Sequence, residues 1–263
     1  IGTGTRIIFT EHGRFYPDRT SWKRKFVNPL LTLFTDKITA ISKATKQALV
    51  DFEYIPTNRI EVIYNGIQPI KADPEKTQFL KQKLNISPTT TVLGTIARLD
   101  PIKNHVMMFK AFKLVIEKHP DTVLILVGDG EERQNLENLV DDLSIRQNVI
   151  FTGYIASPQR YLELMDIFLL SSLSEGTSMT LLEAMSLSKP CVVTDAGGNP
   201  EIINHQGNGL VTKNDNAEQF AEALNSLLTN TLVLKEMANK SFKIFEQSFS
   251  AKKMCQRFKQ IYL

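Results

Sequence analysis

The sequence predicts an α/β protein with a doubly wound, Rossmann-like parallel sheet and a partial second Rossmann-like domain. From residue 91 onward, short apolar or β-branched runs alternate strictly with longer helical patterns. Runs such as residues 122–127 (Thr-Val-Leu-Ile-Leu-Val) are apolar throughout rather than at alternate positions. This indicates strands that are buried on both faces, as in a parallel sheet covered by helices.

The expected elements follow the chain in order. Strands are predicted at 6–10, 37–41, 60–64, 91–96, 122–127, 148–152, 166–170, 190–194 and 209–212. Helices are predicted at 21–34, 43–52, 75–84, 104–118, 131–143, 158–165, 179–188, 199–204, 216–228, 231–247 and 250–261. The strands from residue 91 onward suffice for one doubly wound domain.

A polar connector containing Pro69, Lys71, Asp73 and Pro74 marks the domain boundary. We expect a remnant of an N-terminal domain at 1–66, a main domain at 67–249 and a C-terminal helix at 250–263. The two or three βα units before the connector are too few for a closed core. We therefore expect the chain to open within its first domain.

The composition is that of a soluble globular protein, with 42% hydrophobic and 22% charged residues. A net charge of +3 is too mild to indicate nucleic acid binding. The sequence contains no CxxC pair and no Cys/His cluster that would indicate a zinc site. No apolar run has the length of a membrane span. Two cysteines and the lack of a secretory signal favour the cytoplasm.

Ligands of open α/β sheets bind beyond the carboxyl ends of the strands, so the residues that follow each strand are the candidates. Arg98 and Lys103 follow the strand at 91–96. They suit a diphosphate, because Arg offers a forked donor and Lys a compact charge. The alternative is a solvated loop with scattered charge. Gly128, Gly130 and Gly153 follow the next two strands and fit either ligand contact or plain turns.

The loop after the strand at 166–170 is the most informative. Its small residues open directly into a helix, whose free N–H groups and positive end would face an anion. Glu175 precedes this helix and Glu183 lies two turns inside it, so the first fits a hexose and the second a ribose. The alternative is an N-terminal helix charge and a solvated face residue. Glu183, however, lies between Leu182 and Ala184, where a carboxylate needs a partner.

Together these stretches resemble the retaining GT-B glycosyltransferases of family 4 over nearly the whole chain. The motifs that carry the resemblance are Ala97-Arg-Leu-Asp-Pro-Ile-Lys-Asn104, Leu126-Val-Gly-Asp-Gly130, Val149-Ile-Phe-Thr-Gly-Tyr154, Ser174-Glu-Gly176, Glu183-Ala-Met185, Lys189-Pro190 and Gly197-Gly-Asn-Pro-Glu201. The seven residues between Glu175 and Glu183 are specific in this context. Upstream, Thr10-Glu-His-Gly13, Ile41-Ser-Lys43 and Val62-Ile-Tyr-Asn-Gly-Ile67 are similar to the late first domain and the domain crossover.

The resemblance implies transfer of a hexose-type sugar from a nucleotide-diphosphate sugar to a glycan or lipid-linked acceptor, with retention of configuration. Arg98 and Lys103 would hold the leaving diphosphate, Glu183 the ribose and Glu175 the hexose, while His12 would reach the donor sugar from the acceptor-side first domain. Tyr154 and Ile155 would flank the base. The donor-binding set is completed by the loop residues Gly176, Thr177, Ser178, Met179 and Thr180. The terminal helix would cross back to the first domain.

From family frequency we expect a UDP-sugar donor and a role in polysaccharide or lipid-linked glycan synthesis. We expect no metal and no cofactor, because the two cations and the helix end offset the diphosphate charge and no Asp-x-Asp motif occurs. Ala97 stands where Gly is usual, and the Gly-rich loop that opens the family's first domain does not precede Ile1. The fragment alone is therefore expected to be poorly active.

Two other functions remain open. One is a non-catalytic sugar-nucleotide-binding module, which the intact Glu175 and Glu183 pair disfavours. The other is a different GT-B enzyme, such as a sugar-nucleotide epimerase or a phosphorylase, which the positions of the four histidines and the lack of a marked cofactor lysine disfavour.

Residues 19–26 form a basic patch on an expected helix: Arg19, Lys23, Arg24 and Lys25, with Trp22 and Phe26 among them. This pattern fits peripheral contact with anionic lipid at the inner face of the membrane. The alternative is a solvated helix face with the two aromatic side chains packed inward.

Overall fold

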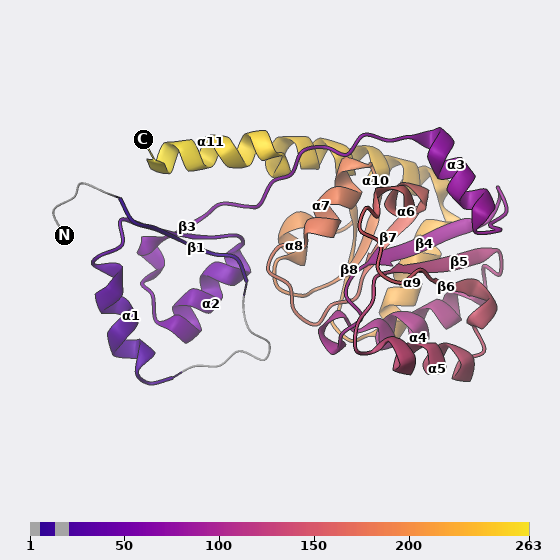
Figure 1. Cartoon of the computed structure of the whole chain (residues 1–263), viewed down its shortest axis with the longest axis horizontal. Coiled ribbons are helices and arrows are strands. Elements are labelled where there is room, and N and C mark those ends of the chain that lie inside the picture. The colour runs from indigo at the N-terminus through magenta and orange to yellow at the C-terminus, as the bar shows by residue number, and fades with distance from the viewer. Residues whose placement is uncertain (1–5, 14–20, 263) are drawn as a thin grey trace.

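The computed structural model describes residues 6–13 and 21–262, which form two parallel sheets with helices packed on them (Figure 1). The larger sheet has the spatial order β6-β5-β4-β7-β8-β9, and the smaller has the order β1-β2-β3. All neighbouring strands within each sheet are parallel. The predicted α/β class with doubly wound parallel strands is confirmed.

The larger sheet reverses its winding direction at its centre. Its strands are β4 (Thr91–Ile96), β5 (Thr122–Val127), β6 (Val149–Phe151), β7 (Ile167–Leu170), β8 (Cys191–Thr194) and β9 (Gly209–Thr212). The chain winds outward from β4 to β6, returns beside β4 as β7, and then winds outward to β9. The carboxyl ends of β4 and β7 are thus the topological switch point, where ligands of such sheets bind.

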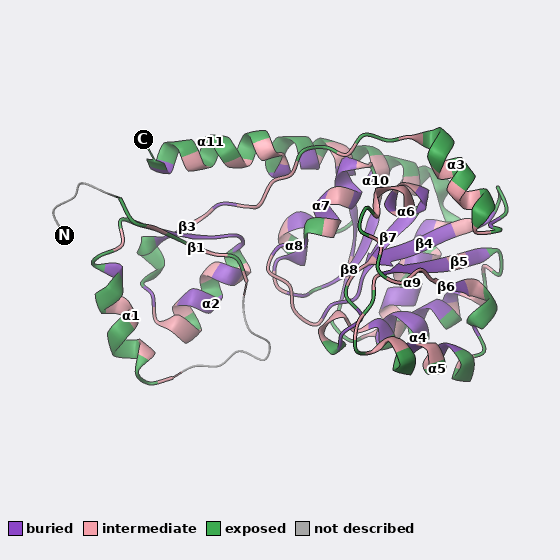
Figure 2. Ribbon diagram, viewed as in Figure 1, coloured by how far each residue is buried: buried purple, intermediate pink, exposed green. Residues whose placement is uncertain are grey.

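Two hydrophobic cores lie on the two faces of this sheet. The first contains helix residues such as Phe109, Phe112 and Phe220, and the second contains helix residues such as Leu181 and Met185. Both cores draw on the same strands, which explains why the strands are apolar throughout. The interior strands are accordingly purple in Figure 2. The helices of the first face are α4 (His105–Ile116), α5 (Arg133–Asp142) and α9 (Ala217–Thr229); those of the second are α6 (Gln159–Leu164), α7 (Met179–Ser186) and α8 (Asn199–Ile202), with α3 (Pro74–Lys83) against α6 and α10 (Thr231–Ile244) following α9.

The smaller sheet has a small core of its own. Its strands are β1 (Ile8–Glu11), β2 (Lys37–Ala40) and β3 (Ile60–Val62), connected by α1 (Arg24–Thr32) and α2 (Lys43–Glu53). Ile38, Ala40, Leu49, Ile55 and Ile60 pack together.

The C-terminal helix α11 (Ala251–Tyr262) extends from the larger sheet to the smaller one (Figure 1). Arg257 pairs with Glu61 of β3 at 2.7 Å. At the start of α11, Ala251 N donates to the carbonyl oxygen of Ile67 in the connector at 2.8 Å. The connector and α11 are therefore the two segments that link the sheets, and they are hydrogen-bonded to each other at the start of α11.

Most predicted element boundaries differ from the structure by one or two residues, and three helices show the differences that matter most for the fold. The helix expected at 21–34 is shorter, since α1 spans Arg24–Thr32. The helix expected at 131–143 begins at Arg133, because residues before it form a turn. The helix expected at 231–247 ends at Ile244 and continues as a π-helical turn, Phe245–Phe249.

The aromatic side chains of the basic patch point to solvent. Trp22 is 72% exposed and Phe26 is 68% exposed, so the interpretation that they pack inward is wrong. Arg24 pairs with Glu53, and Arg19 lies outside the described residues. Within the described part of the chain, no helix has the length and apolar character needed to cross a membrane.

Candidate active site

The loops after β4 and β7 are bonded to each other at the switch point. Asp100 caps a 3-10 turn, Pro101–Lys103, by accepting from the N–H of Lys103 at 3.2 Å. Ser171 Oγ donates to the carbonyl oxygen of Lys103 at 2.7 Å, and Leu173 N donates to that of Ile102 at 2.8 Å. The Asp-Pro-Ile-Lys sequence is thereby fixed as a turn that carries the Lys103 side chain to the loop after β7.

Lys103 and Glu175 form an ion pair across these loops. Lys103 Nζ donates to Glu175 Oε1 at 2.7 Å, and Ser172 Oγ donates to the same oxygen at 2.6 Å. The two side chains are 22% and 9% exposed, so both charges are largely withdrawn from water. An ammonium group has three donors, so the pair leaves Lys103 with capacity for a further acceptor.

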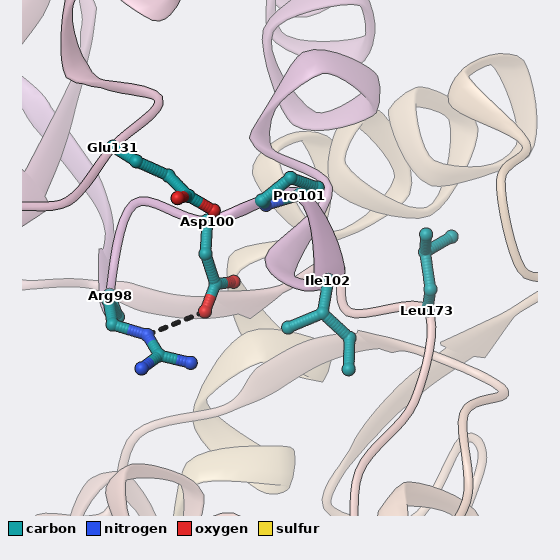
Figure 3. Close-up of a pocket in the computed structure, with 6 residues that line it drawn as sticks. All are labelled: Arg98, Asp100, Pro101, Ile102, Glu131 and Leu173. Carbon is teal, nitrogen blue, oxygen red and sulfur yellow. Dashed lines mark hydrogen bonds and ion pairs between the residues drawn. The ribbon is translucent and has the colours of Figure 1, made fainter. Parts of the chain in front are cut away.

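Arg98 lies on the same loop but makes a different contact. Its Nε donates to Asp100 Oδ2 at 2.6 Å, and its side chain is 75% exposed. The terminal guanidinium nitrogens point away from Asp100 (Figure 3). Three loops line the pocket of about 490 Å³ beside it, through Arg98, Asp100, Pro101, Ile102, Glu131 and Leu173. Arg98 can thus present two nitrogen atoms to an anion in this pocket.

Helix α7 begins just beyond Glu175. Ser178 is its N-cap and accepts from Leu181 N at 3.4 Å, while its hydroxyl lies 3.1 Å from that of Thr180. The N–H groups of Met179 and Thr180 are in the first turn, where a helix offers no internal acceptor. Together with the helix dipole they favour a negative charge at this end.

Glu183 lies about one turn inside α7, rather than the two turns expected, and is half-buried. Its carboxylate makes no hydrogen bond or ion pair within residues 6–13 and 21–262. Burial raises the pKa of this carboxyl above its ordinary value. Its oxygens therefore have unused acceptor capacity in partly desolvated surroundings, which hydroxyl donors of a ligand would satisfy.

The glycines that follow β5 and β6 allow the loops to pack closely. Gly128 has a φ of +145°, and a Cβ there would lie 1.9 Å from the carbonyl oxygen of Ala97. A Cβ on Gly130 would lie 2.3 Å from that of Leu99, and Gly128 N donates to Gly153 O at 3.0 Å. Of the two open interpretations, the structural one accounts for these glycines without a ligand.

The smaller sheet reaches the loop after β7. Thr177 is buried, and its hydroxyl donates to the carbonyl oxygen of Ile41 at 2.9 Å. A Cβ on Gly176 would lie 3.1 Å from Ile41 Cδ1 and 3.5 Å from the carbonyl oxygen of His12. His12 therefore lies beside this loop, whereas the Thr177 hydroxyl is committed to the contact between the two sheets.

The remaining predicted residues lie at the rim or in the core. Tyr154 is 77% exposed after β6, and Ile155 packs against the core on the α7 side. Met179 is 43% exposed at the start of α7. Sequence reasoning missed Asp100 and Ser172, which orient Arg98 and Glu175; polar residues directly after β4 and β7 were the available signal. In the described ranges, no group of three His, Cys, Asp or Glu side chains could hold a metal ion.

Family models match both parts of the chain. Residues 76–243 match "Glycosyl transferases group 1", and residues 1–70 match "Glycosyltransferase Family 4". The chain belongs to the group 1 glycosyl transferases. The recognition of a family 4, GT-B protein from its motifs is thereby confirmed.

Curated relatives agree with this family, and a solved structure shares the fold. The Escherichia coli UDP-Gal:alpha-D-GlcNAc-diphosphoundecaprenol alpha-1,3-galactosyltransferase is 27% identical over 98% of this chain and 68% of its own length. The Bacillus anthracis N-acetyl-alpha-D-glucosaminyl L-malate synthase is 28% identical over 87% of the chain and 59% of its own length. Anabaena HepE, crystallised with UDP, superposes with a TM-score of 0.90 at 24% identity, covering 98% of this chain and 72% of HepE. The chain spans 58% to 70% of the length of four such curated relatives.

Proposed function

We propose that this group 1 glycosyltransferase moves a hexose-type sugar from a UDP-sugar to a glycan or lipid-linked acceptor, with retention of configuration. The observation that carries the proposal is the juxtaposition of Lys103, Glu175 and the start of α7 at the switch point. It supplies a cation, a sugar-binding carboxylate and a helix N-terminus within one loop cluster. The E. coli galactosyltransferase and the UDP complex of HepE support the choice of nucleotide.

The donor is assigned to the larger sheet as follows. The diphosphate binds Lys103, the terminal nitrogens of Arg98 and the first N–H groups of α7. The ribose hydroxyls donate to the half-buried Glu183 carboxylate, and the hexose hydroxyls bind Glu175. The base lies beside Tyr154 and Ile155, and His12 approaches the hexose from the smaller sheet.

The chemical step breaks the bond between the anomeric carbon and the diphosphate oxygen. Negative charge grows on the departing diphosphate, where Arg98, Lys103 and the helix end offset it without a metal ion. The acceptor hydroxyl attacks the anomeric carbon from the face that the diphosphate leaves, and its proton passes to the departing phosphate oxygen. This path retains the anomeric configuration.

Nucleotide binding is the first test. We expect the chain to bind UDP in calorimetry with little dependence on Mg²⁺, and to bind GDP and ADP more weakly. Glu183→Ala should lower the affinity at least about tenfold, because it removes hydrogen bonds to a charged group. Glu222→Ala, which removes an exposed carboxylate on α9, is the matched control. Equal binding by the wild type and Glu183→Ala would reject the ribose assignment.

Transfer itself is tested with the full-length protein and UDP-sugars. Proton NMR of the product gives its anomeric configuration, which should equal that of the donor. An inverted product would reject the retaining mechanism, and no transfer or hydrolysis of any donor would favour the binding-module alternative.

We further propose that the exposed face formed by residues 22–34 contacts an anionic membrane. Lys23 and Lys25 lie between the exposed Trp22 and Phe26 in the sequence. The apolar face continues with exposed residues of α1 and the turn after it: Val27, Leu30, Leu31, Leu33 and Phe34. Apolar side chains beside cations match an anionic lipid interface. Sedimentation with vesicles of phosphatidylglycerol and phosphatidylcholine should retain the protein at low salt. Trp22→Ala with Phe26→Ala should release it, and equal sedimentation of both proteins would reject this surface.

A further inference from the structure

The carboxylate of Glu201, on a helix that packs on the larger sheet, binds the N-terminus of α2 beside the smaller sheet. Glu201 lies in α8, after β8. Its Oε2 accepts from the backbone N–H of Lys43 at 2.7 Å, and its Oε1 accepts from that of Ala44 at 2.8 Å. The hydroxyl of Tyr64, in the connector, donates to Oε2 at 2.9 Å. Glu201 therefore binds three groups from the N-terminal part of the chain, 137 to 158 residues away.

These bonds complete the N-terminus of α2. The first four N–H groups of a helix lack internal partners. In α2 the Ser42 hydroxyl accepts from Thr45 N at 2.9 Å, and the Ser42 carbonyl accepts from Lys46 N at 2.9 Å. The N–H groups of Lys43 and Ala44 donate to Glu201 instead. A carboxylate at this position also gains from the helix dipole, so the contact is stronger than a neutral hydrogen bond.

The contact is continuous with the loop that carries Glu175. Gly198, at the start of α8, donates its N–H to the carbonyl oxygen of Glu175 at 3.1 Å. A Cβ on Gly198 would lie 1.9 Å from the carbonyl oxygen of Gly176 and 3.3 Å from Ser42 Cβ. The Thr177 hydroxyl holds Ile41 in the same place. The start of α2, the loop after β7 and α8 thus pack together, with no room for a methyl group at Gly198.

We propose that Glu201 is a positioning residue that fixes the smaller sheet over the switch-point loops. By holding the N-terminus of α2 it sets the distance between His12 and the loop at 175–178. Its catalytic meaning rests on the proposed sugar transfer, but the grip on α2 does not. The charged residues that are proposed to bind the donor belong to the larger sheet. Loss of Glu201 should therefore impair turnover more than donor binding.

Hydrogen exchange tests the grip directly. In the intact chain, mass spectrometry with residue-level fragmentation should show the amides of Lys43 and Ala44 exchanging about tenfold or more faster in Glu201→Ala than in the wild type. Glu201→Gln should lie between, because its amide has one accepting oxygen. The amides of β2 and β8 should be unchanged, which shows that the variants fold. Glu218→Ala, which removes an exposed first-turn carboxylate of α9, is the matched control.

Binding and turnover test the positioning role. In calorimetry, UDP affinity should change less than about threefold in Glu201→Ala. In the full-length protein, kcat for the donor selected by the nucleotide titration should fall about tenfold or more with little change in KM. Unchanged exchange at Lys43 and Ala44 would overturn the grip, and a UDP affinity that falls as far as kcat would overturn the positioning role. If the wild type binds no nucleotide, the proposed function fails, while the exchange comparison still decides the grip.

Discussion

The ion pair between Lys103 and Glu175 should be strongly coupled in stability. At 2.7 Å, two unit charges attract by about 6 kcal/mol at an effective dielectric constant of about 20. Desolvation of both groups offsets much of this attraction. Lys103→Met leaves a 9% exposed Glu175 carboxylate with only the Ser172 hydroxyl, and we expect a cost of about 3 kcal/mol. Glu175→Gln keeps an acceptor for both donors and should cost about 1–2 kcal/mol.

A double-mutant cycle measures the coupling. Urea unfolding of the wild type, both single variants and the double variant should give a coupling of about 2 kcal/mol, because the double variant buries no unpaired charge. A coupling below about 0.5 kcal/mol would show that solvent screens the pair and would refute the reasoning. The same four proteins, titrated with UDP, separate the two roles. Lys103→Met should weaken binding, whereas Glu175→Gln should leave it nearly unchanged, because UDP carries no hexose.

Three further predictions concern turnover, pH and loop packing. Arg98→Ala or Lys103→Ala in the full-length enzyme should cost about 2–4 kcal/mol of transition-state stabilisation, read from kcat/KM, and near wild-type turnover of the double variant would reject the assignment. Burial lowers the pKa of His105 to about 4, against about 6.5 when unfolded. As the pH falls, the unfolded chain therefore protonates His105 before the folded chain does. The contribution of this residue to the free energy of unfolding is complete above about pH 6.5 and falls by about 3 kcal/mol toward pH 4. Urea titrations of His105→Leu should lack this decline. Gly128→Ala should cost more than about 2 kcal/mol in urea unfolding, because the new methyl group meets the Ala97 carbonyl at an unfavourable φ; a smaller loss would show that these loops can yield.

The fold followed from local patterns, because strands that are buried on both faces must be apolar throughout. The carboxyl ends of parallel strands that face the same way lie at one edge of the sheet. From this rule the sequence also predicted that Arg98, Lys103 and Glu175 share that edge. The sequence did not specify which strands are neighbours. Only the adjacency of β4 and β7 joins Lys103 to Glu175, 72 residues away.

Contacts between the two sheets were beyond sequence reasoning. Glu201 reads as an acidic residue in the first turn of a helix, and nothing local indicates that it binds the start of α2. In the sequence Thr177 likewise resembles a turn residue before α7, yet its hydroxyl donates to the carbonyl oxygen of Ile41. The exposure of Trp22 and Phe26 depends on which side of α1 faces the small core, which periodicity alone left open.

The loop after β7 has two attachments, and their order along the chain matters. Ser172 and Glu175 bind toward Lys103, whereas Gly176 and Thr177 contact the smaller sheet. Because these residues are nearly consecutive, the backbone cannot move at one attachment without moving the other. In the proposed binding mode, the residues that hold the diphosphate and ribose belong to the larger sheet alone, but the placement of Glu175, which is proposed to bind the hexose, depends on both sheets. If sugar transfer proceeds as proposed, a loop built in this way would let the smaller sheet influence the reacting sugar while the nucleotide stays in place, and this is why Glu201 is expected to act on turnover more than on affinity.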